Sequence, residues 1–498
     1  MHKLYLPQDT NYLIFIGTVL YIINTKSKTP LHIQLYDALK DDIISHLKVG
    51  DKLPSIRKIV SLYTLSKTTV ESAYSQLYAE GYIESRPKSG YYVSDFQFSS
   101  ITSQNTLIPM KEQTTESHKY DFFPAQLNKE DFPLKLWKRL STKAITQSLD
   151  FGSYHDGQGE LTLREEIARY VINSRGVVCD AEQIVICHGF SDAIELLAKL
   201  VKDTYTHFSI ENPGYHVARR AFEAYGYDIN KIDVDTQGIN IKDLQSSNPQ
   251  IVYITPSHQY PTGVSMPISN RLKLIEYMQS IKGLIIEDDY DSELSYDTRP
   301  IPSLQGLDHY DCVVYMGTFS KSLSPALRLS YMVLPKHVVP LFKKSYDAHF
   351  PRVSLITQHT LTLFLAGGHY EKHVRKIRTL NMKKHNLMKK QFQEKLGDTF
   401  EILSQGGGLA ILIMPTVPFD WDKFNVLAQE YSIKLYYAKE RSGGNFEALR
   451  MGFGGFSEEK LVEAVDLFAR VWLKALLSAP LSDSNSEEQH LVLKQTDS

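Results

Sequence analysis

Short apolar runs alternate with longer helix-like runs across residues 120–475, and this pattern limits the folds open to the chain. Short apolar runs bounded by turn residues are typical of buried strands, and the longer runs between them are typical of helices. Strand-like runs occupy 183–187, 207–210, 251–254, 283–286 and 312–316, and helix-like runs occupy 191–202 and 270–279. The alternation predicts parallel strands joined by helical crossovers, and therefore an α/β sheet. Ligands bind such sheets at the carboxyl ends of the strands.

At 498 residues the chain is too long for one ordinary domain, and about two or three are expected. A stretch rich in Ser, Thr and Gln, without hydrophobic periodicity, indicates a linker between a small N-terminal module and the large body. The predicted parts are an N-terminal extension at 1–23, a small α+β module at 24–95, a linker at 96–119, the α/β body at 120–475 and a disordered tail at 476–498.

Charge is distributed unevenly along the chain. The formal net charge of -2 excludes a uniformly basic nucleic-acid coat. Residues 26–93, however, carry ten Lys and Arg against seven Asp and Glu, which leaves a local net charge of +3. This modest excess suits a module that binds DNA as a dimer.

The apolar run at 13–23 is about half as long as a membrane span. Little positive charge precedes it and no small-residue cleavage site follows it, so no signal peptide is expected. Only three cysteines occur, none of them in a CxxC pair, which is typical of buried free thiols in a reducing compartment. We therefore expect a cytoplasmic protein with no membrane segment and no metal site, whose residues 13–23 form a short strand or an unusual extension.

Two short helices separated by a tight turn are predicted at 54–63 and 67–77. Ser55 and Ser66 are suitable N-caps for them. Two helices at this spacing form a helix-turn-helix, whose second helix can enter the major groove by its N-terminal end. Residues 84–93 then predict a strand, a basic turn and a strand, which together form a hairpin wing. The alternative is a small helical bundle with solvated lysines.

Residues 30–93 resemble the winged helix-turn-helix of the GntR family. The match includes the L-P-S-x-R entry at 53–57 and the L-x-x-E-G-Y-I exit at 77–83. The resemblance implies double-stranded operator DNA as a partner. The DNA contacts that it implies are Arg57, Ser66, Lys67, Thr68, Thr69, Arg86 and Lys88.

Lys321 lies among small hydroxyl residues, after Thr318 and Ser320, with Arg328 seven positions further on. One large class of enzymes holds pyridoxal phosphate (PLP) in this way. The lysine forms a Schiff base with the aldehyde, and the hydroxyls and the arginine hold the phosphate. Arginine suits the phosphate because its planar guanidinium makes paired, charge-assisted hydrogen bonds.

A second part of the phosphate site is predicted at Gly189, Phe190 and Ser191, between a strand and a helix. Backbone amides at a helix N-terminus bind anions, and glycine permits the close approach. A turn that serves only as an N-cap is the alternative.

Asp288 ends an apolar strand and is predicted to pair with the pyridine nitrogen of the cofactor, which would keep the ring protonated as an electron sink. Tyr290, two residues on, would point to the same side and reach the phenolate oxygen. Tyr215 could stack on the ring face. Since four acids crowd into 287–291, a solvated acidic turn is the alternative. Tyr260 stands before Pro-Thr-Gly, where many PLP enzymes have an asparagine that bonds the phenolate oxygen.

Residues 120–475 resemble fold-type-I aminotransferases, and S-H-Q-Y-P-T-G, E-D-D-Y-D-S-E and T-F-S-K-x6-R within them resemble the MocR/GabR group. That group joins a GntR-type DNA reader to an aminotransferase-like body. The expected fold is therefore a small α+β winged helix-turn-helix followed by a large α/β PLP-binding domain. The resemblance also implies a homodimer, arranged head to tail.

Three further assignments come from this resemblance. Arg450 matches the arginine that binds the α-carboxylate of an amino acid, although a surface ion pair is the alternative. Tyr154 matches the tyrosine that crosses the dimer to the partner's phosphate. GABA-responsive members carry an arginine after Pro-Gly-Tyr; His216 stands there, with Arg219 and Arg220 a turn later, which argues against GABA as the effector.

These observations leave three functions open. The first is a transcriptional regulator that senses PLP, an amine or an amino acid at Lys321. The second is a working aminotransferase with an accessory DNA-binding module, because Lys321, Asp288 and Arg450 would suffice for proton transfer. The third is a DNA-binding protein whose body serves only for dimerisation. Turnover separates the first two, and the absence of PLP absorbance would support the third.

Overall fold

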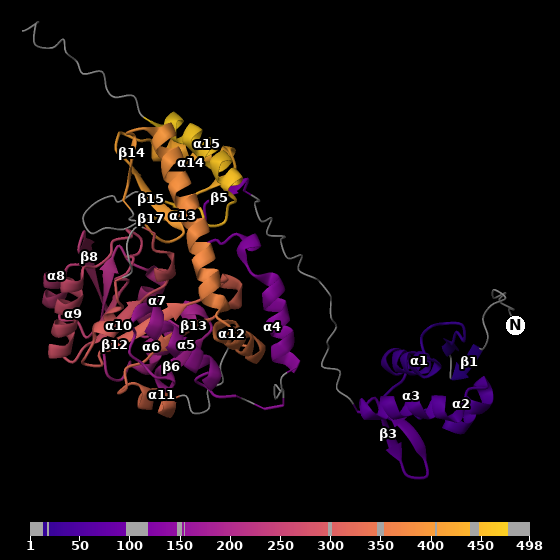
Figure 1. The fold of residues 1–498 in the computed structure, drawn as a ribbon. Helices are drawn as coiled ribbons and strands as arrows, with labels where there is room; N and C mark the ends of the chain where they lie inside the picture. The colour runs from indigo at the N-terminus through magenta and orange to yellow at the C-terminus, as the bar shows by residue number, and fades with distance from the viewer. Residues whose placement is uncertain are drawn as a thin grey trace, which may run out of the picture. The chain divides into compact units, whose positions relative to one another are not determined.

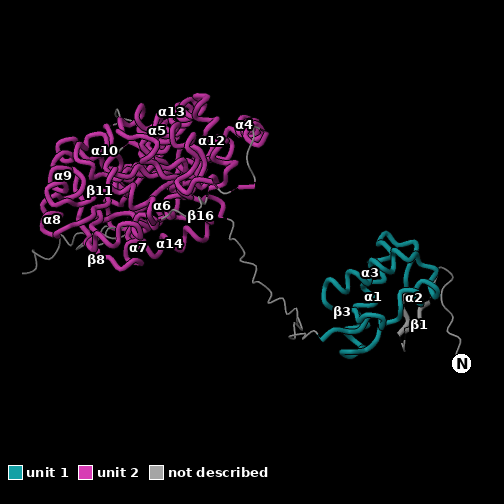
Figure 2. Tube along the Cα trace, turned by 90° about the horizontal axis from the view of Figure 1, so that it is seen from below, with its two compact units in different colours: residues 1–115 teal, residues 116–498 magenta. Residues whose placement is uncertain are grey.

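The computed structural model describes residues 13–16, 19–95, 118–146, 152–153, 155–296, 301–345, 353–403, 406–438 and 448–476. The chain divides into two compact units, residues 1–115 and 116–498 (Figure 2). All of the predicted linker at 96–119 except residues 118 and 119 lies outside the described residues, as does the predicted tail after residue 476.

Unit 1 contains the predicted helix-turn-helix and its wing. Its elements are β1 (Leu13–Ile16), β2 (Val19–Ile22), α1 (Leu31–Ser45), α2 (Ile56–Tyr63), α3 (Lys67–Ala79), β3 (Ile83–Arg86) and β4 (Gly90–Val93). The apolar run near the N-terminus forms the antiparallel pair β1 and β2. Both predicted N-caps are confirmed: Ser55 Oγ accepts from the amide of Lys58 at 3.2 Å, and Ser66 Oγ accepts from the amide of Thr69 at 3.1 Å.

Helix α3 is held in unit 1 by one apolar face. Val70, Ala73, Tyr74 and Leu77 recur at helical spacing and are fully buried. The hydroxyl of Tyr74 also donates to the carbonyl of Pro54 at 2.8 Å, which ties α3 to the start of α2. The buried face fixes the helix, and its N-terminal end is left at the surface.

Unit 2 is built on an eight-stranded sheet with the strand order β6-β13-β12-β11-β10-β7-β8-β9. The strands are β6 (Ile184–Cys187), β7 (His207–Asn212), β8 (Asp228–Asp235), β9 (Gly238–Ile239), β10 (Ile251–Ile254), β11 (Leu284–Asp288), β12 (Val313–Thr318) and β13 (Ser330–Val333). All five predicted strands are present, and β7, β10, β11 and β12 run parallel. The central strands are buried along their whole length, as strands covered on both faces must be.

The sheet is mixed: the five predicted strands run in one direction, and two further strands are antiparallel to their neighbours. β13 lies antiparallel between β12 and β6, and β9 is antiparallel to β8. The physical reason is the connection: residues 319–329 between β12 and β13 contain one short 3-10 turn, Pro325–Leu327, in place of a crossover helix. Without a crossover, the chain returns in the opposite direction.

Helices and a smaller sheet complete unit 2. The helices are α4 (Leu134–Thr146), α5 (Leu161–Arg175), α6 (Gly189–Leu200), α7 (His216–Ala224), α8 (Ile241–Ser246), α9 (Ile268–Ser280), α10 (Leu304–Leu307), α11 (Val339–Ser345), α12 (Leu355–Ala366), α13 (His369–Leu396), α14 (Trp421–Glu430) and α15 (Glu458–Ala475). The smaller sheet has the order β14 (Phe400–Ile402), β15 (Ala410–Pro415), β18 (Ala448–Gly452) and β17 (Tyr437–Ala438). A separate parallel pair joins β5 (Tyr120–Asp121) to β16 (Ile433–Lys434).

The long helix α13 connects the two parts of unit 2. It runs from α12, beside the main sheet, to the smaller sheet and α15 (Figure 1). Its inner face buries Met388, Phe392 and Leu396 in the same apolar cluster as Phe468 and Trp472 of α15. Among the helices that the structure describes, none is long and apolar enough to cross a lipid bilayer.

Candidate functional site: a lysine pocket at the edge of the main sheet

The predicted motifs of the body gather at one edge of the main sheet. β7, β10, β11 and β12 are parallel, and β6 has the same direction because β13 is antiparallel to both β6 and β12. The residues that follow these strands therefore share one edge. Arg328 lies at the same edge, because it directly precedes β13 and the antiparallel β13 begins where β12 ends.

Lys321 lies in a pocket formed by both sheets of unit 2. The pocket is lined by Pro124, His258, Pro261, Tyr290, Asp291, Lys321, residues 408–412 and Arg450. Burial, together with the positive charge of Arg450, lowers the pKa of the Lys321 ammonium from 10.5 to about 8, against the opposing effect of Asp291 and Asp288. At neutral pH a much larger fraction of this amine is unprotonated than for an ordinary lysine, so Lys321 is suited to act as a nucleophile.

Gly189 and the guanidinium of Arg328 lie against each other. Gly189 has a φ of +77°, and a Cβ there would fall 2.2 Å from Arg328 Nη2. Arg328 is exposed, and its side chain forms no ion pair within the described residues. Thr318 and Ser320 are bonded to each other, Oγ1 to Oγ, at 3.0 Å. A cation beside backbone amides at the start of α6 is a suitable anion site.

Ser191 is exposed on the first turn of α6, and Phe190 is partly buried. The Phe190 ring lies 5.2 Å from that of Tyr215 and 6.2 Å from that of Tyr253. Burial raises the pKa of Tyr215 to about 12, so its hydroxyl stays neutral at physiological pH. Phe190 and Tyr215 thus form an aromatic wall beside the anion site.

Asp288 is a buried carboxyl at the end of β11. The hydroxyl of Tyr253 donates to its Oδ2 at 2.5 Å, and Asp288 forms no ion pair within the described residues. Burial raises the pKa of Asp288 to about 7, and the neighbouring charges of Asp289, Asp291 and Glu211 act in the same direction. A cationic partner would therefore stabilise the charged form of this carboxyl.

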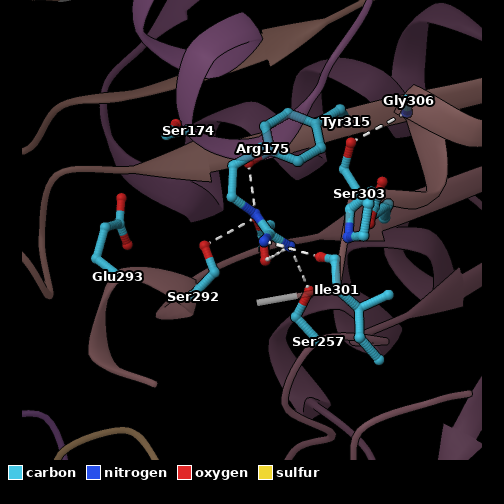
Figure 3. A network of polar contacts seen from close by, with 12 residues as sticks. Ser174, Arg175, Ser257, Ser292, Glu293, Ile301, Ser303, Gly306 and Tyr315 are labelled. Carbon is cyan, nitrogen blue, oxygen red and sulfur yellow. Dashed lines mark hydrogen bonds and ion pairs between the residues drawn. The ribbon is translucent and has the colours of Figure 1, made fainter. Parts of the chain in front are cut away.

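The alternative of a solvated acidic turn is excluded. Glu287, Asp288, Asp289 and Asp291 are each no more than 6% exposed. Asp289 is held by a buried network around Arg175 (Figure 3), whose Nε donates to its Oδ2 at 2.6 Å. The hydroxyl of Tyr315 donates to the same oxygen at 2.7 Å. These bonds keep the pKa of Asp289 below its usual range despite burial.

The Arg175 network also fixes loops around the site. Its Nη2 donates to Ser257 Oγ at 2.8 Å and its Nη1 donates to the carbonyl of Ile301 at 2.9 Å (Figure 3). One arginine of α5 thus joins the end of β11 to the loop after β10. Because Arg175 bonds Asp289 and Ser257, it also helps to position their sequence neighbours, Asp288 and His258.

Arg450 of β18 contacts Tyr260, the residue before Pro-Thr-Gly. Its Nη1 donates to the Tyr260 hydroxyl, and its Cζ lies 4.3 Å from the centre of the Tyr260 ring. Arg450 forms no ion pair with any described acid, so the alternative of a surface ion pair is not supported by the described residues. The hydroxyl of Tyr290 donates to the carbonyl of His258 at 3.0 Å.

The residues after Tyr215 point elsewhere. His216 is exposed, its ring 5.6 Å from that of Tyr215. Arg219 donates to Glu223 one turn along α7 at 2.8 Å, and Arg220 is exposed. None of the three lines the Lys321 pocket. Tyr154 lies outside the described residues.

The sequence did not indicate a contact between His258 and Asp291 in the pocket wall. His258 Nδ1 lies 2.9 Å from Asp291 Oδ2, and both residues line the pocket. It also missed Tyr253, which holds Asp288. His258 and Asp291 belong to the S-H-Q-Y-P-T-G and E-D-D-Y-D-S-E motifs, and their place in these motifs was the only indication that they could lie at the site. The pairing itself spans 33 positions and has no local signature.

In unit 1 the predicted DNA contacts are at the surface. Arg57, Ser66, Lys67, Thr68 and Lys88 are exposed, and Thr69 is partly buried. Their present partners are local. Lys67 Nζ lies 3.3 Å from Glu71. In the wing, Arg86 Nη2 lies 2.7 Å from Glu84, and Arg86 Cζ lies 4.3 Å from the Tyr92 ring.

The chain matches two family models. Residues 31–93 match that of the bacterial regulatory proteins of the gntR family, and residues 125–468 match that of aminotransferase class I and II. The winged helix-turn-helix and the α/β body each fall within one match.

Relatives share both parts. The chain is 37% identical to the uncharacterized HTH-type transcriptional regulator YhdI of Bacillus subtilis, over 92% of this chain and 98% of that protein. It is 31% identical to the probable rhizopine catabolism regulatory protein MocR of Rhizobium meliloti, over 87% and 89%. It is 26% identical to the pyridoxine biosynthesis regulator PdxR of Corynebacterium glutamicum, over 83% and 90%.

Solved aminotransferases share the fold of the body. Pyrococcus horikoshii kynurenine aminotransferase superposes with a TM-score of 0.65 at 23% identity, over 73% of this chain and 92% of that one. LysN, an α-aminoadipate aminotransferase of Thermus thermophilus, superposes with a TM-score of 0.64 at 22% identity, over 71% and 92%. These likenesses establish the fold-type-I architecture.

The residues at the sheet edge fit the PLP that this family uses. A Cβ at Gly189 would collide with the guanidinium of Arg328, so the glycine lets this cation lie against the backbone at the start of α6, where it can bind a phosphate. The carboxyl of Asp288 is buried, and no described residue gives it the cationic partner that a pyridinium would provide. The amine of Lys321 has a lowered pKa in the same region. The family matches, the fold and the residues of the site agree. The chain therefore belongs to the MocR-type regulators, in which a GntR-type DNA-binding domain is joined to a PLP-binding domain of the aminotransferase class I and II family.

Proposed function

We propose that this regulator senses PLP, or an amine or amino acid that reacts at Lys321, and changes its binding to operator DNA in response. One observation carries the proposal: the low-pKa amine of Lys321 shares a pocket with Arg450, a cation that has no acidic partner among the described residues. An amine with a carboxylate is the ligand that such a pocket suits. The name of the relative PdxR supports PLP itself as a second signal.

The residues have separate tasks in this proposal. PLP, when bound, supplies an aldehyde carbon that amines attack. Lys321 would hold the cofactor until an effector amine takes its place, and Asp288 would stabilise a proton on the ring nitrogen. Gly189, Phe190, Ser191, Thr318, Ser320 and Arg328 bind the phosphate. Tyr215 would stack on the ring, Tyr290 would reach the phenolate oxygen, and Tyr260 would line the same site. Arg450 binds the effector's carboxylate.

The DNA-binding form is proposed to be a homodimer whose bodies pack head to tail, with Tyr154 reaching the partner's phosphate. Two winged helices would then contact two half-sites of an operator, by Arg57, Ser66, Lys67, Thr68, Thr69, Arg86 and Lys88. The effector can act only by its differential affinity for the two conformations of this dimer. The smaller sheet, which carries Arg450, is the part that an effector's carboxylate would draw toward Lys321.

The proposal is tested by DNA binding. The PLP-loaded protein is titrated onto the duplex upstream of its own gene and onto a random duplex at fixed salt, with and without a pool of amino acids. Selective binding that shifts with PLP or the pool is expected, and Lys321→Ala should lose the shift while still binding DNA. Equal affinity for both duplexes would contradict a regulatory role.

Transamination is the second candidate, because Lys321 and Arg450 share one pocket and Asp288 lies close enough to affect the pKa of Lys321. A regulator should hold the amine without turnover, whereas an aminotransferase releases an oxo acid. Assaying oxo-acid release from the same amino-acid pool separates the two functions.

A further inference from the structure

Tyr260 gives both its hydroxyl and its ring to Arg450. Arg450 Nη1 donates to the Tyr260 hydroxyl, while Arg450 Cζ stands 4.3 Å from the ring centre. The first contact is a hydrogen bond from a charged donor, and the second is a cation–π contact. One side chain thus restrains the guanidinium in two directions.

Tyr260 is itself well fixed. Its ring packs edge-on against Tyr215, with centroids 5.1 Å apart, and lies 6.4 Å from the ring of Tyr290. Its amide donates to Thr255 Oγ1 at 3.0 Å. Thr255 in turn donates to the buried carboxyl of Glu211 at 2.7 Å. Tyr260 is therefore a rigid support rather than a mobile side chain.

Arg450 keeps most of its binding capacity. A guanidinium has five N–H donors, and Tyr260 is the only side chain to which Arg450 is bonded within the described residues. Tyr260 covers one face of the guanidinium, and no described acceptor is bonded to the donors of its remaining edge. Arg450 lines the pocket that contains Lys321, so a ligand held at Lys321 is within the same enclosure as this edge.

We propose that Tyr260 is a positioning residue that presents the free edge of Arg450 to the effector's carboxylate, and so selects amines that carry a carboxylate. The inference rests on the proposed function, and it explains why an amine with a carboxylate would be preferred to one without. Tyr260 follows β10 of the main sheet and Arg450 belongs to β18 of the smaller sheet, so this contact also sets where the carboxylate clamp lies relative to Lys321.

The test compares two amines that differ only in the carboxylate, L-alanine and ethylamine. Each is titrated into the PLP-loaded full-length protein, and the dissociation constant is read from the visible absorbance of the cofactor. Tyr260→Phe keeps the ring and removes the hydroxyl, and Tyr260→Ala removes both. Tyr310→Phe, at an exposed tyrosine outside the pocket, is the matched control.

L-alanine binding should weaken about two- to tenfold in Tyr260→Phe, the range expected for one lost hydrogen bond, and further in Tyr260→Ala. Ethylamine binding should weaken by a smaller factor than L-alanine binding in both variants, because ethylamine has no carboxylate for Arg450 to bind. Equal losses for both amines would show a general structural role and overturn the inference. Tighter binding of L-alanine in Tyr260→Phe would also overturn it, since the hydroxyl would then be a competitor of the carboxylate. If neither amine altered the wild-type spectrum, the proposed amine sensing would fail and this inference with it.

Discussion

At the residue scale, the site depends on how burial changes the charge of single groups. Lys321 is an amine whose surroundings favour the neutral form, and Asp288 is a carboxyl whose surroundings also disfavour charge. Both shifts follow chiefly from desolvation. PLP would relieve both, because its aldehyde reacts with a neutral amine and its ring nitrogen offers Asp288 a cationic partner.

The lowered pKa of Lys321 predicts the pH dependence of cofactor uptake. Only the neutral amine attacks the aldehyde, so the rate of PLP incorporation into the apo-protein should rise about tenfold per pH unit below about pH 8 and level off above it. The rate is followed by visible absorbance, with Lys321→Ala as the variant that should give no signal. An increase that continued to pH 10 would show an unshifted lysine.

The contact between Gly189 and Arg328 predicts an effect specific to one glycine. Gly189→Ala should weaken PLP binding by about tenfold or more, because the new Cβ would collide with the guanidinium. Gly176→Ala is the matched control: its φ of +67° imposes similar backbone strain, but its Cβ would have no neighbour within 4 Å. The two PLP dissociation constants are compared. Equal effects would mean that strain alone is responsible.

At the scale of elements, each functional group is placed by the end of a strand or helix. The parallel strands bring Lys321, Asp288 and Tyr215 to one edge although up to 106 positions separate them, from 215 to 321. In unit 1 the capped start of α3 groups four of the predicted DNA contacts, Ser66, Lys67, Thr68 and Thr69. The Ser66 hydroxyl accepts from the amide of Thr69, so its side chain is already bonded in the cap.

The helix-turn-helix predicts a separation between DNA binding and cofactor binding. Arg57→Ala should weaken operator binding by roughly tenfold and, if Arg57 meets a phosphate, reduce the slope of log affinity against log salt by about 0.9. PLP uptake should not change, because Arg57 belongs to unit 1 and Lys321 to unit 2. Salt titrations of wild type and variant give the slope. Unchanged DNA affinity would remove Arg57 from the interface.

The cap of α3 predicts a change in stability. Ser66→Ala leaves the amide of Thr69 without its acceptor and should lower the free energy of unfolding of unit 1 by about 1 kcal/mol. Ser66→Asn, which keeps a capping acceptor, should recover most of the loss. Denaturant unfolding, followed by far-ultraviolet circular dichroism, measures both variants.

At the scale of the whole molecule, the two units have different ligands and must influence each other for regulation to occur. Thermodynamic linkage requires that influence to be mutual. An amine that changes operator affinity by some factor must itself bind with an affinity changed by the same factor when operator is present. Amine titrations with and without saturating operator measure this. An effect in one direction only would contradict an equilibrium sensor.

Local chemistry determined much of this protein from its sequence alone. Hydrophobic periodicity, the two serine caps and the order of the motifs were sufficient to predict two of the winged-helix helices, five strands of the main sheet and the lysine pocket's central residue. These features depend on residues that are close together along the chain, so a short sequence pattern is enough to predict them. The likeness to a known family depended on the same short motifs.

Only the tertiary structure decided which distant groups meet. The antiparallel insertion of β13, the pairing of His258 with Asp291, the approach of Arg328 to Gly189 and the support of Arg450 by Tyr260 all join separate parts of the chain. Their partners are chosen by packing and by the need to satisfy buried charge. Tyr260 is the clearest case: its position before Pro-Thr-Gly predicts a place in the cofactor site, and only the fold shows that its hydroxyl also meets Arg450, 190 positions away.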